Sequence, residues 1–205
     1  QLNCISQSIK DRQLFHDLNL NIKAPASLAI FGETGSGKST LANLIVGILS
    51  PRKGTINYRY QGNFVYGRPH ISYMIQEEYL FDDTILQNIR IGNPDLSDEN
   101  FKQILKICEL EEIYKNHLGA IGENGSKLSG GERKRLMLVR TLADQKADIF
   151  IFDELSSSLD SDTFFRIFHS VEAMLDNKIR IYIEHNRQVK PFVSSVICIE
   201  NNIYF

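Results

Sequence analysis

The stretch Gly32-Glu33-Thr34-Gly35-Ser36-Gly37-Lys38-Ser39-Thr40 decides the fold class of this chain. It follows the pattern of Gly, any four residues, Gly, Lys, and then Ser or Thr. The apolar run at residues 27–31 before it predicts a short buried strand, and residues 39–48 after it predict a helix. The glycines therefore lie at a strand-to-helix turn, where a backbone without side chains can approach a ligand closely.

Such a turn is suited to a polyphosphate. Successive backbone N–H groups and the helix N-terminus attract anionic oxygens, Lys38 adds a point charge, and the Ser39 hydroxyl is a ligand for Mg²⁺. The alternative is a glycine-rich turn that carries a solvated lysine, and the strand and helix on either side disfavour it. The stretch predicts a nucleoside triphosphate site.

Composition excludes several other classes of protein. The chain has 205 residues, of which 42% are hydrophobic and 23% charged, as in an ordinary soluble domain with or without a subdomain. A formal charge of -2 gives no electrostatic case for a nucleic-acid partner, and the basic run at residues 133–135 is too short to change that. No apolar run approaches the roughly 18 residues that a membrane span requires, and no signal peptide is present.

Cys4, Cys108 and Cys198 lie far apart and lack the spacing of metal ligands, so we expect buried thiols in a reducing compartment. The chain begins at Gln1 rather than Met, which fits a segment of a longer protein.

Hydrophobic patterns predict an α/β protein. Residues 17–22 alternate as a half-buried strand would, with Leu18, Leu20 and Ile22 inward. Further strands are predicted at 55–60, 71–75, 149–152 and 179–183, with a closing hairpin of 195–200 and 203–205 around Asn201-Asn202. Helices are predicted at 84–90, at 97–110 with Ser97 as N-cap, and at 109–117, 132–143 and 160–175. We read residues 77–128 as a helical subdomain inserted into a strand-rich core with a parallel sheet, whose ligands lie at the carboxyl ends of the strands.

Two polar pairs directly follow predicted buried strands. Asp153-Glu154 follows the strand predicted at 149–152. One carboxylate can hold Mg²⁺ and the other can orient an attacking water. A solvated acidic turn is the alternative. Glu184-His185 follows the strand predicted at 179–183. From spacing alone, His185 is either a γ-phosphate contact or an ordinary surface histidine.

Leu128-Ser129-Gly130-Gly131-Glu132 begins another helix. Ser129 is a good N-cap, and two glycines beside a helix N-terminus offer a second anion site. An ordinary capped helix start explains the same residues.

Taken together, these motifs make the chain resemble the nucleotide-binding domain of an ATP-binding cassette (ABC) transporter, from about residue 2 to residue 204. Residues 32–40 are similar to Walker A and 149–153 to Walker B, Glu154 to the catalytic glutamate, Gln76 to the Q-loop glutamine and His185 to the switch histidine. Residues 128–132 resemble the LSGGQ signature with Glu132 in place of Gln, and residues 157–160 resemble the D-loop with Ser158 in place of Ala.

The resemblance implies a P-loop NTPase (RecA-like) core with an N-terminal antiparallel β subdomain, formed by residues 1–76 and 129–205, and a helical signature subdomain at 77–128. It implies that Lys38, Gln76, Glu154 and His185 are catalytic, and that Ser39, Gln76 and Asp153 serve Mg²⁺. The implied ATP contacts are Ile9, Gly32, Glu33, Thr34, Gly35, Ser36, Gly37, Lys38, Ser39 and Thr40. The contacts to the ATP of a second domain are implied to be Leu128, Ser129, Gly130, Gly131 and Glu132, with Ser157 and Asp160 in the D-loop.

Further features resemble the exporters of the family: residues 73–89 resemble their Q-loop and following helix, and residues 121–125 resemble their X-loop. The resemblance then implies a second nucleotide-binding domain, identical or not, as partner and a transmembrane domain in the same longer chain. It also implies a place at the cytoplasmic face of the plasma (inner) membrane. The alternatives are an ABC ATPase outside transport, which usually has two cassettes or a coiled-coil insertion, and a silent regulatory module, which intact Glu154, His185 and Ser129 argue against. One departure is Ile9, which stands where the family usually stacks an aromatic on adenine.

Overall fold

The computed structural model describes residues 1–10, 12–60, 63–64, 67–76, 79–185, 187–200 and 203–204. The chain forms two compact units, which we call the strand unit and the helical unit. The strand unit comprises Gln1–Ile71, Asp148–Asp153 and Asn177–Phe205, and the helical unit comprises Ser72–Ala147 and Glu154–Asp176. The subdomain boundaries expected at residues 77 and 128 differ from this division and stay a prediction.

The strand unit is built on a parallel sheet. Its strands run in the order β11 (Ile203–Tyr204), β10 (Ser195–Glu200), β3 (Ala26–Gly32), β9 (Ile179–Ile183) and β8 (Ile149–Asp153), and only β11 is antiparallel to its neighbour. The α/β fold class and the predicted strands of this sheet are thereby confirmed, while Asn201 and Asn202 of the predicted hairpin turn lie outside the described residues. Strand β7 (Ile71–Met74) leads the chain from the strand unit into the helical unit.

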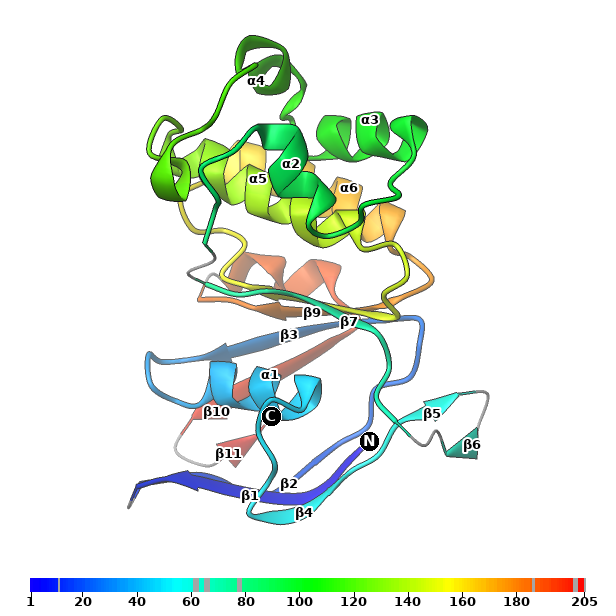
Figure 1. Cartoon of the computed structure of the whole chain (residues 1–205). Coiled ribbons are helices and arrows are strands. Elements are labelled where there is room, and N and C mark those ends of the chain that lie inside the picture. The colour runs from blue at the N-terminus through cyan, green and yellow to red at the C-terminus, as the bar shows by residue number, and fades with distance from the viewer. Residues whose placement is uncertain are drawn as a thin grey trace. The chain divides into compact units, whose positions relative to one another are not determined.

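Large buried side chains pack against one another on the strands of this sheet. The rings of Phe150 and Phe152 stack with centroids 6.4 Å apart, and those of Phe152 and Tyr182 with centroids 5.1 Å apart. All three side chains are fully buried, as continuous apolar runs in a covered parallel sheet should be. Helix α1 (Lys38–Val46) lies between β3 and a second, antiparallel sheet of the same unit (Figure 1).

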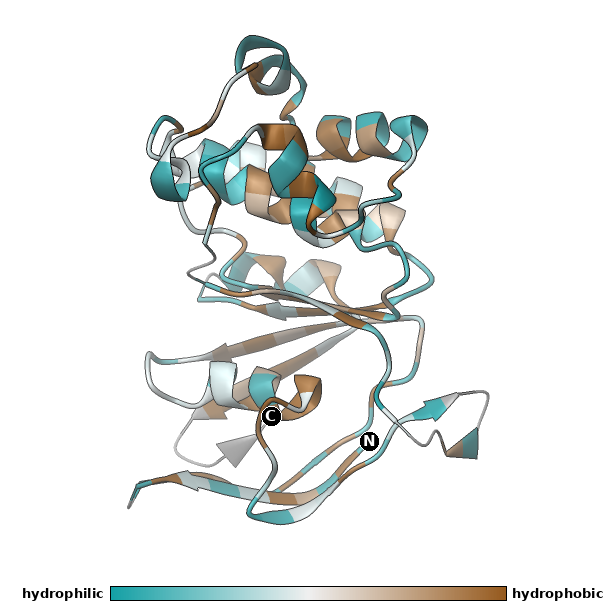
Figure 2. Cartoon of the chain, viewed as in Figure 1, coloured by the Kyte–Doolittle hydropathy of each residue, from teal (hydrophilic) through white to brown (hydrophobic). Residues whose placement is uncertain are grey.

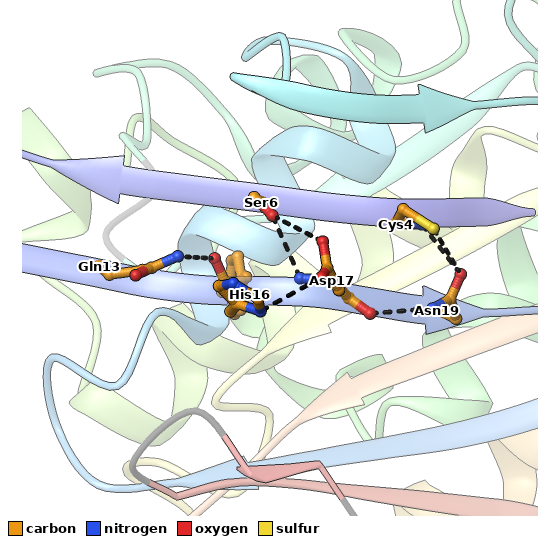
Figure 3. Close-up of polar contacts among 7 residues, drawn as sticks. Cys4, Ser6, Gln13, His16, Asp17 and Asn19 are labelled. Atoms are coloured by element: carbon orange, nitrogen blue, oxygen red, sulfur yellow. Dashed lines mark hydrogen bonds and ion pairs between the residues drawn. The ribbon is translucent and has the colours of Figure 1, made fainter.

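The antiparallel sheet has the order β2 (Arg12–Leu20), β1 (Leu2–Ile9) and β4 (Lys53–Ile56), with register shifts along β1. Cys4 and Asp17 take positive φ at these irregularities, where side chains replace missing ladder bonds: the Cys4 N–H donates to Asn19 Oδ1 at 2.9 Å, and the Asp17 N–H to Ser6 Oγ at 3.1 Å (Figure 3). Such bulges leave a residue unpaired and rotate the side chains that follow.

The bulges explain two errors of the sequence prediction. The strand expected at residues 17–22 begins earlier, at Arg12, and ends at Leu20, so Leu18 is buried but Leu20 and Ile22 are only half-buried. Cys4 is an exposed free thiol and not a buried one, because it lies at an irregularity of β1 where its φ is positive; Cys108 is buried as expected, and Cys198 is half-buried.

The strand expected at residues 55–60 is also broken. Its second part, β5 (Arg59–Tyr60), pairs with β6 (Asn63–Phe64) in a separate hairpin, where the Arg59 guanidinium lies 4.1 Å from the centroid of the Phe64 ring. The remaining element of the strand unit is a short 3₁₀ helix, η2 (Arg187–Phe192).

The helical unit holds several helices, most of which begin with a side-chain cap. Its elements are α2 (Ile85–Arg90), α3 (Asp98–Ile107), α4 (Glu111–Asn116), the 3₁₀ turn η1 (Glu123–Gly125), α5 (Gly130–Ala143) and α6 (Ser161–Met174). The N-caps of α2, α3, α5 and α6 are Thr84, Ser97, Ser129 and Asp160, each accepting a hydrogen bond from the backbone three residues on, whereas α4 has no side-chain cap.

The predicted helices are thereby confirmed, and in Figure 2 their ribbons carry brown and teal segments in alternation, as amphipathic helices do. Within the described residues, no helix is both long enough and apolar enough to cross a bilayer.

Candidate functional site

The phosphate loop connects β3 to α1 in the strand unit. Gly35 and Gly37 take φ of 79° and 108°, a region that L side chains avoid, and a Cβ on Gly37 would lie 3.0 Å from Cζ of the buried Phe15. Gly37 is also the N-cap of α1, and glycine has no side chain to accept a bond from the first turn. The first-turn N–H groups of α1 are thus suited to an anionic ligand.

Lys38 folds back over this loop. Its Nζ donates to the carbonyl oxygens of Gly32 at 2.7 Å and Glu33 at 3.1 Å, and its side chain is only 7% exposed. A buried ammonium requires such acceptors, because leaving its donors unsatisfied is costly. The carbonyls hold the charge beside the loop.

Ser39 and Asp153, two predicted metal ligands, are in contact. The Ser39 hydroxyl donates to Asp153 Oδ2 at 3.1 Å, and Asp153 is 3% exposed at the end of β8. Mg²⁺ demands an octahedron of oxygens at 2.0–2.1 Å, in which neighbouring ligands are about 2.9 Å apart. The two oxygens therefore fit one edge of a magnesium coordination sphere. Within the described residues, no cluster of three or more His, Cys, Asp or Glu side chains offers another kind of metal site.

A cavity of about 280 Å³ opens beside the phosphate loop. It is lined by Ile9, Arg12 and Leu14 from β1 and β2, and by loop and α1 residues that include Gly35 and Thr40. Ile9 is 50% exposed and pairs across the strands with Arg12. Ile9 thus lines the same cavity as the loop, and its implied contact with ATP stays a prediction. Sequence reasoning missed Arg12, whose position depends on the register of the β1–β2 pair.

His185 lies at the same edge of the parallel sheet as the loop and Asp153. Ile30 of β3 is paired with Ile183 of β9, and Ile183 with Asp153 of β8, so the carboxyl ends of the three strands lie at one edge of the sheet. His185 is exposed there. Glu184, to which the sequence analysis assigned no role, is fully buried, and its backbone N–H donates to the carbonyl of Ile30 at 3.1 Å.

The helical unit contains two other predicted catalytic residues, and these are bonded to each other. Gln76 Nε2 donates to Glu154 Oε2 at 2.7 Å, although the residues are 78 positions apart. Glu154 takes a positive φ of 56°, a conformation that is uncommon outside glycine. Ser157 of the D-loop donates from its hydroxyl to the Glu154 carbonyl at 2.8 Å and so braces this turn.

The signature residues form a capping box at the start of α5. The Ser129 N–H donates to the Glu132 carboxylate at 2.7 Å, and the Glu132 N–H donates to Ser129 Oγ at 3.3 Å. The hydrogen bond from the Ser129 backbone is the main cause that lowers the pKa of Glu132. Leu128, just before the box, is buried. The capped helix start is therefore present, and the anion role of this segment stays a prediction.

The D-loop packs on the signature glycines. A Cβ on Gly131 would lie 3.0 Å from the carbonyl oxygen of Ser158, and one on Gly130 would lie 3.5 Å from Ser158 Cβ. Asp160 ends the D-loop by capping α6: its Oδ1 accepts the Thr163 N–H at 2.9 Å, and this bond lowers the pKa of Asp160.

Comparison with known proteins yields one family. The family model described as ABC transporter matches residues 15–157. A putative export ATP-binding/permease protein of Rickettsia felis is 35% identical over 181 residues, which are 84% of this chain and 31% of that protein. The ATP-dependent lipid A-core flippase of Desulfotalea psychrophila is 30% identical over 206 residues, which are 96% of this chain and 36% of that protein.

A solved structure also matches this chain. The structure of a bacterial Atm1-family ABC exporter with ATP bound matches with a TM-score of 0.87 at 25% identity, over 100% of this chain and 37% of that chain. The chain thus spans about a third of the length of these relatives, and only 16% of the ABC transporter ATM1 of Toxoplasma gondii, to which it is 34% identical. The chain belongs to the ABC transporter family, as a nucleotide-binding ATPase domain of the exporter type.

Proposed function

We propose that this domain binds ATP with Mg²⁺ and hydrolyses it within a sandwich of two nucleotide-binding domains, and that the cycle drives export through a transmembrane domain. The observation that carries the proposal is the Ser39–Asp153 pair beneath the phosphate loop, at 3.1 Å, with Lys38 held over the same loop. The relatives named as exporters and flippase support the direction of transport.

In the strand unit, Lys38 exchanges its carbonyl partners for the β- and γ-phosphates. The glycines of residues 32–40 and the first turn of α1 donate backbone N–H groups to the phosphate oxygens. Ser39 and Asp153 would hold Mg²⁺, which would neutralise charge on the phosphates, and Gln76 of the helical unit stays a predicted third ligand. His185, exposed at the end of β9, reaches the γ-phosphate.

In the helical unit, Glu154 orients and polarises the attacking water. Gln76, whose amide donates to the Glu154 carboxylate at 2.7 Å, holds that carboxylate in place until nucleotide arrives. Phosphoryl transfer depends mainly on positioning and charge stabilisation, so the orientation of Glu154 is a large part of what this chain contributes.

The other half of each site comes from a second domain, either an identical chain or a related one. Ser129, Gly130 and Gly131 present the N-terminus of α5 to the partner's nucleotide, flanked by Leu128 and Glu132. The D-loop packs on the two glycines through Ser158, and its residues Ser157 and Asp160 brace the loop by their bonds to Glu154 and Thr163. Hydrolysis in an isolated half-site should therefore be slow.

The helical unit also faces the transmembrane domain, at the cytoplasmic face of the membrane. Tyr79 and Phe81 are each 50% exposed, and their rings meet edge to face at 5.3 Å. The Tyr79 carbonyl accepts a bond from Arg140 Nη2 at 2.8 Å, which ties this aromatic pair to α5. An exposed aromatic pair close in sequence to Gln76 suits a surface that transmits nucleotide binding to a partner.

The test is Glu154→Gln. This substitution keeps the shape of the side chain but removes the charge that polarises water, so turnover should fall by at least about a hundredfold, as for loss of a general base. ATP should still bind, and a dimer should accumulate, seen by size-exclusion chromatography with light scattering in the presence of ATP. Glu111→Gln, at the start of α4, is the matched control and should leave both properties unchanged. Near-normal hydrolysis by the Glu154→Gln variant would contradict the assignment.

A further inference from the structure

The cavity beside the phosphate loop lacks the side chain that would normally stack on a purine. Its volume of about 280 Å³ is close to the lower end of the roughly 300–1,000 Å³ range of ligand pockets. Ile9, Arg12 and Leu14 line it together with residues of the loop and α1, and none of the lining residues is aromatic. Phe15, the nearest aromatic in sequence, is fully buried beneath Gly37.

Arg12 is the lining residue with a planar, delocalised side chain. It is the first residue of β2 and the cross-strand partner of Ile9, so both side chains reach the cavity from the same end of the antiparallel sheet. Arg12 Nη1 lies 3.6 Å from the position that a Cβ on Gly35 would take, so the guanidinium lies alongside the backbone of the loop. Arg12 is exposed, and its charge is available to a ligand.

A guanidinium plane can stack on a nucleobase and attract its π face. We propose that Arg12 takes the place of the missing aromatic and stacks on the adenine of ATP, with Ile9 covering the base from the other strand. The proposal rests on the function proposed above, because it concerns how the same site holds its nucleotide. It assigns the base end of the site to β1 and β2, whereas the loop and α1 hold the phosphates.

The same position also permits a different contact. Gly35 belongs to the phosphate loop, so a guanidinium beside it can instead bind the triphosphate as a simple countercharge. The two contacts predict different ligand selectivity. Stacking stabilises only ligands that carry a base, whereas a countercharge stabilises every triphosphate equally.

The experiment is isothermal titration of the 205-residue chain with Mg-ATP and, separately, with magnesium tripolyphosphate, which has the same phosphates and no base. Arg12→Ala should weaken ATP binding by about three- to tenfold and leave tripolyphosphate affinity within a factor of about two. Arg12→Lys keeps the charge but loses the plane, and should resemble Arg12→Ala. Arg12→Tyr restores a stacking surface and should bind ATP at least as well as the unaltered chain.

Arg52→Ala, which removes an exposed arginine of the same unit outside the cavity, is the matched control.

The outcomes are separable. Equal weakening of ATP and tripolyphosphate by Arg12→Ala would assign Arg12 to the phosphates and overturn the proposal, as would ATP affinity that does not change. Failure of the unaltered chain to bind either ligand would instead contradict the proposed nucleotide function itself. Loss of ATP affinity alone, restored by Arg12→Tyr, supports the stacking role.

Discussion

Lys38, Asp153 and Glu184 are charged side chains that folding has nearly removed from solvent, with exposed fractions of 7%, 3% and 0%. Burial of a charge is unfavourable unless hydrogen bonds compensate for the lost water. Lys38 has two carbonyl acceptors, and Asp153 has the Ser39 hydroxyl. Asp153 ends β8, Glu184 follows β9 and Lys38 begins α1, so all three charges lie at one edge of the parallel sheet, as charged groups of a functional site do.

A single substitution at Ile9 tests the part of the site proposed to hold the adenine base. Ile9→Tyr places an aromatic ring at the cavity and should tighten Mg-ATP binding by about 1 kcal/mol, or roughly fivefold, because a ring stacks on adenine more favourably than an aliphatic chain does. Titration calorimetry measures the change. Ile48→Tyr alters another exposed isoleucine of the strand unit that does not line the cavity and should leave affinity unchanged. Unchanged or weaker binding by the Ile9→Tyr variant would show that Ile9 does not lie beside the adenine.

At the scale of elements, the start of α5 is held from two sides. The Ser129–Glu132 capping box satisfies its first donors, and the D-loop packs its Ser158 carbonyl onto Gly131. Ser158 has a positive φ of 63°, so the loop has limited freedom to move away from an added methyl group. The signature and the D-loop therefore act as one local structure within the helical unit.

This packing distinguishes the two glycines of the signature. Gly131→Ala brings a methyl group to 3.0 Å from the Ser158 carbonyl oxygen, whereas Gly130→Ala meets nothing closer than 3.5 Å. Overpacking costs about 1–3 kcal/mol, and both variants gain the same helix propensity. The Gly131→Ala variant should therefore be less stable than the Gly130→Ala variant by about 1 kcal/mol or more in urea unfolding. Equal stability of the two would mean that the D-loop yields to the methyl group.

At the scale of the whole molecule, the helical unit depends on carboxylates that fold ionised. The pKa of Glu109 is lowered chiefly by its hydrogen bond from Arg166, at 2.7 Å, and those of Glu132 and Asp160 are lowered by backbone N–H groups at helix starts. Each group binds protons more weakly in the folded chain than in the unfolded one. Their contribution to stability is fully present above the unfolded pKa of about 4.3 for Glu and 3.9 for Asp, and is lost as pH falls through the lowered folded pKa.

The expected result is a free energy of unfolding that falls between about pH 6 and pH 3. Glu109→Gln removes the charge that Arg166 pairs with, so this variant should be less stable than the unaltered chain near pH 7 and should approach it as pH falls. Urea unfolding followed by circular dichroism at several pH values measures both curves. A gap between the two chains that stays constant down to pH 3 would show that ionisation of Glu109 does not carry the effect.

The sequence by itself determined the features that depend on neighbouring residues. The loop of residues 32–40 needs glycine at Gly35 and Gly37 because φ is positive there, and the helix starts follow from caps such as Ser97 and Asp160. The strands of the parallel sheet were predictable because burial on both faces requires continuous apolar runs. These signals are local in the chain, and local geometry is enough to produce them.

Tertiary structure alone decided the features that depend on strand register and on distant contacts. The pairing of β1 with β2 starts the strand at Arg12 instead of residue 17 and sets Arg12 opposite Ile9. The Gln76–Glu154 bond joins residues 78 positions apart, and the Ser158 carbonyl meets Gly131 only because the D-loop folds back on α5. Pairing register and chain return are set by the packing of the whole unit, so no pattern along the sequence specifies which side chains they bring together.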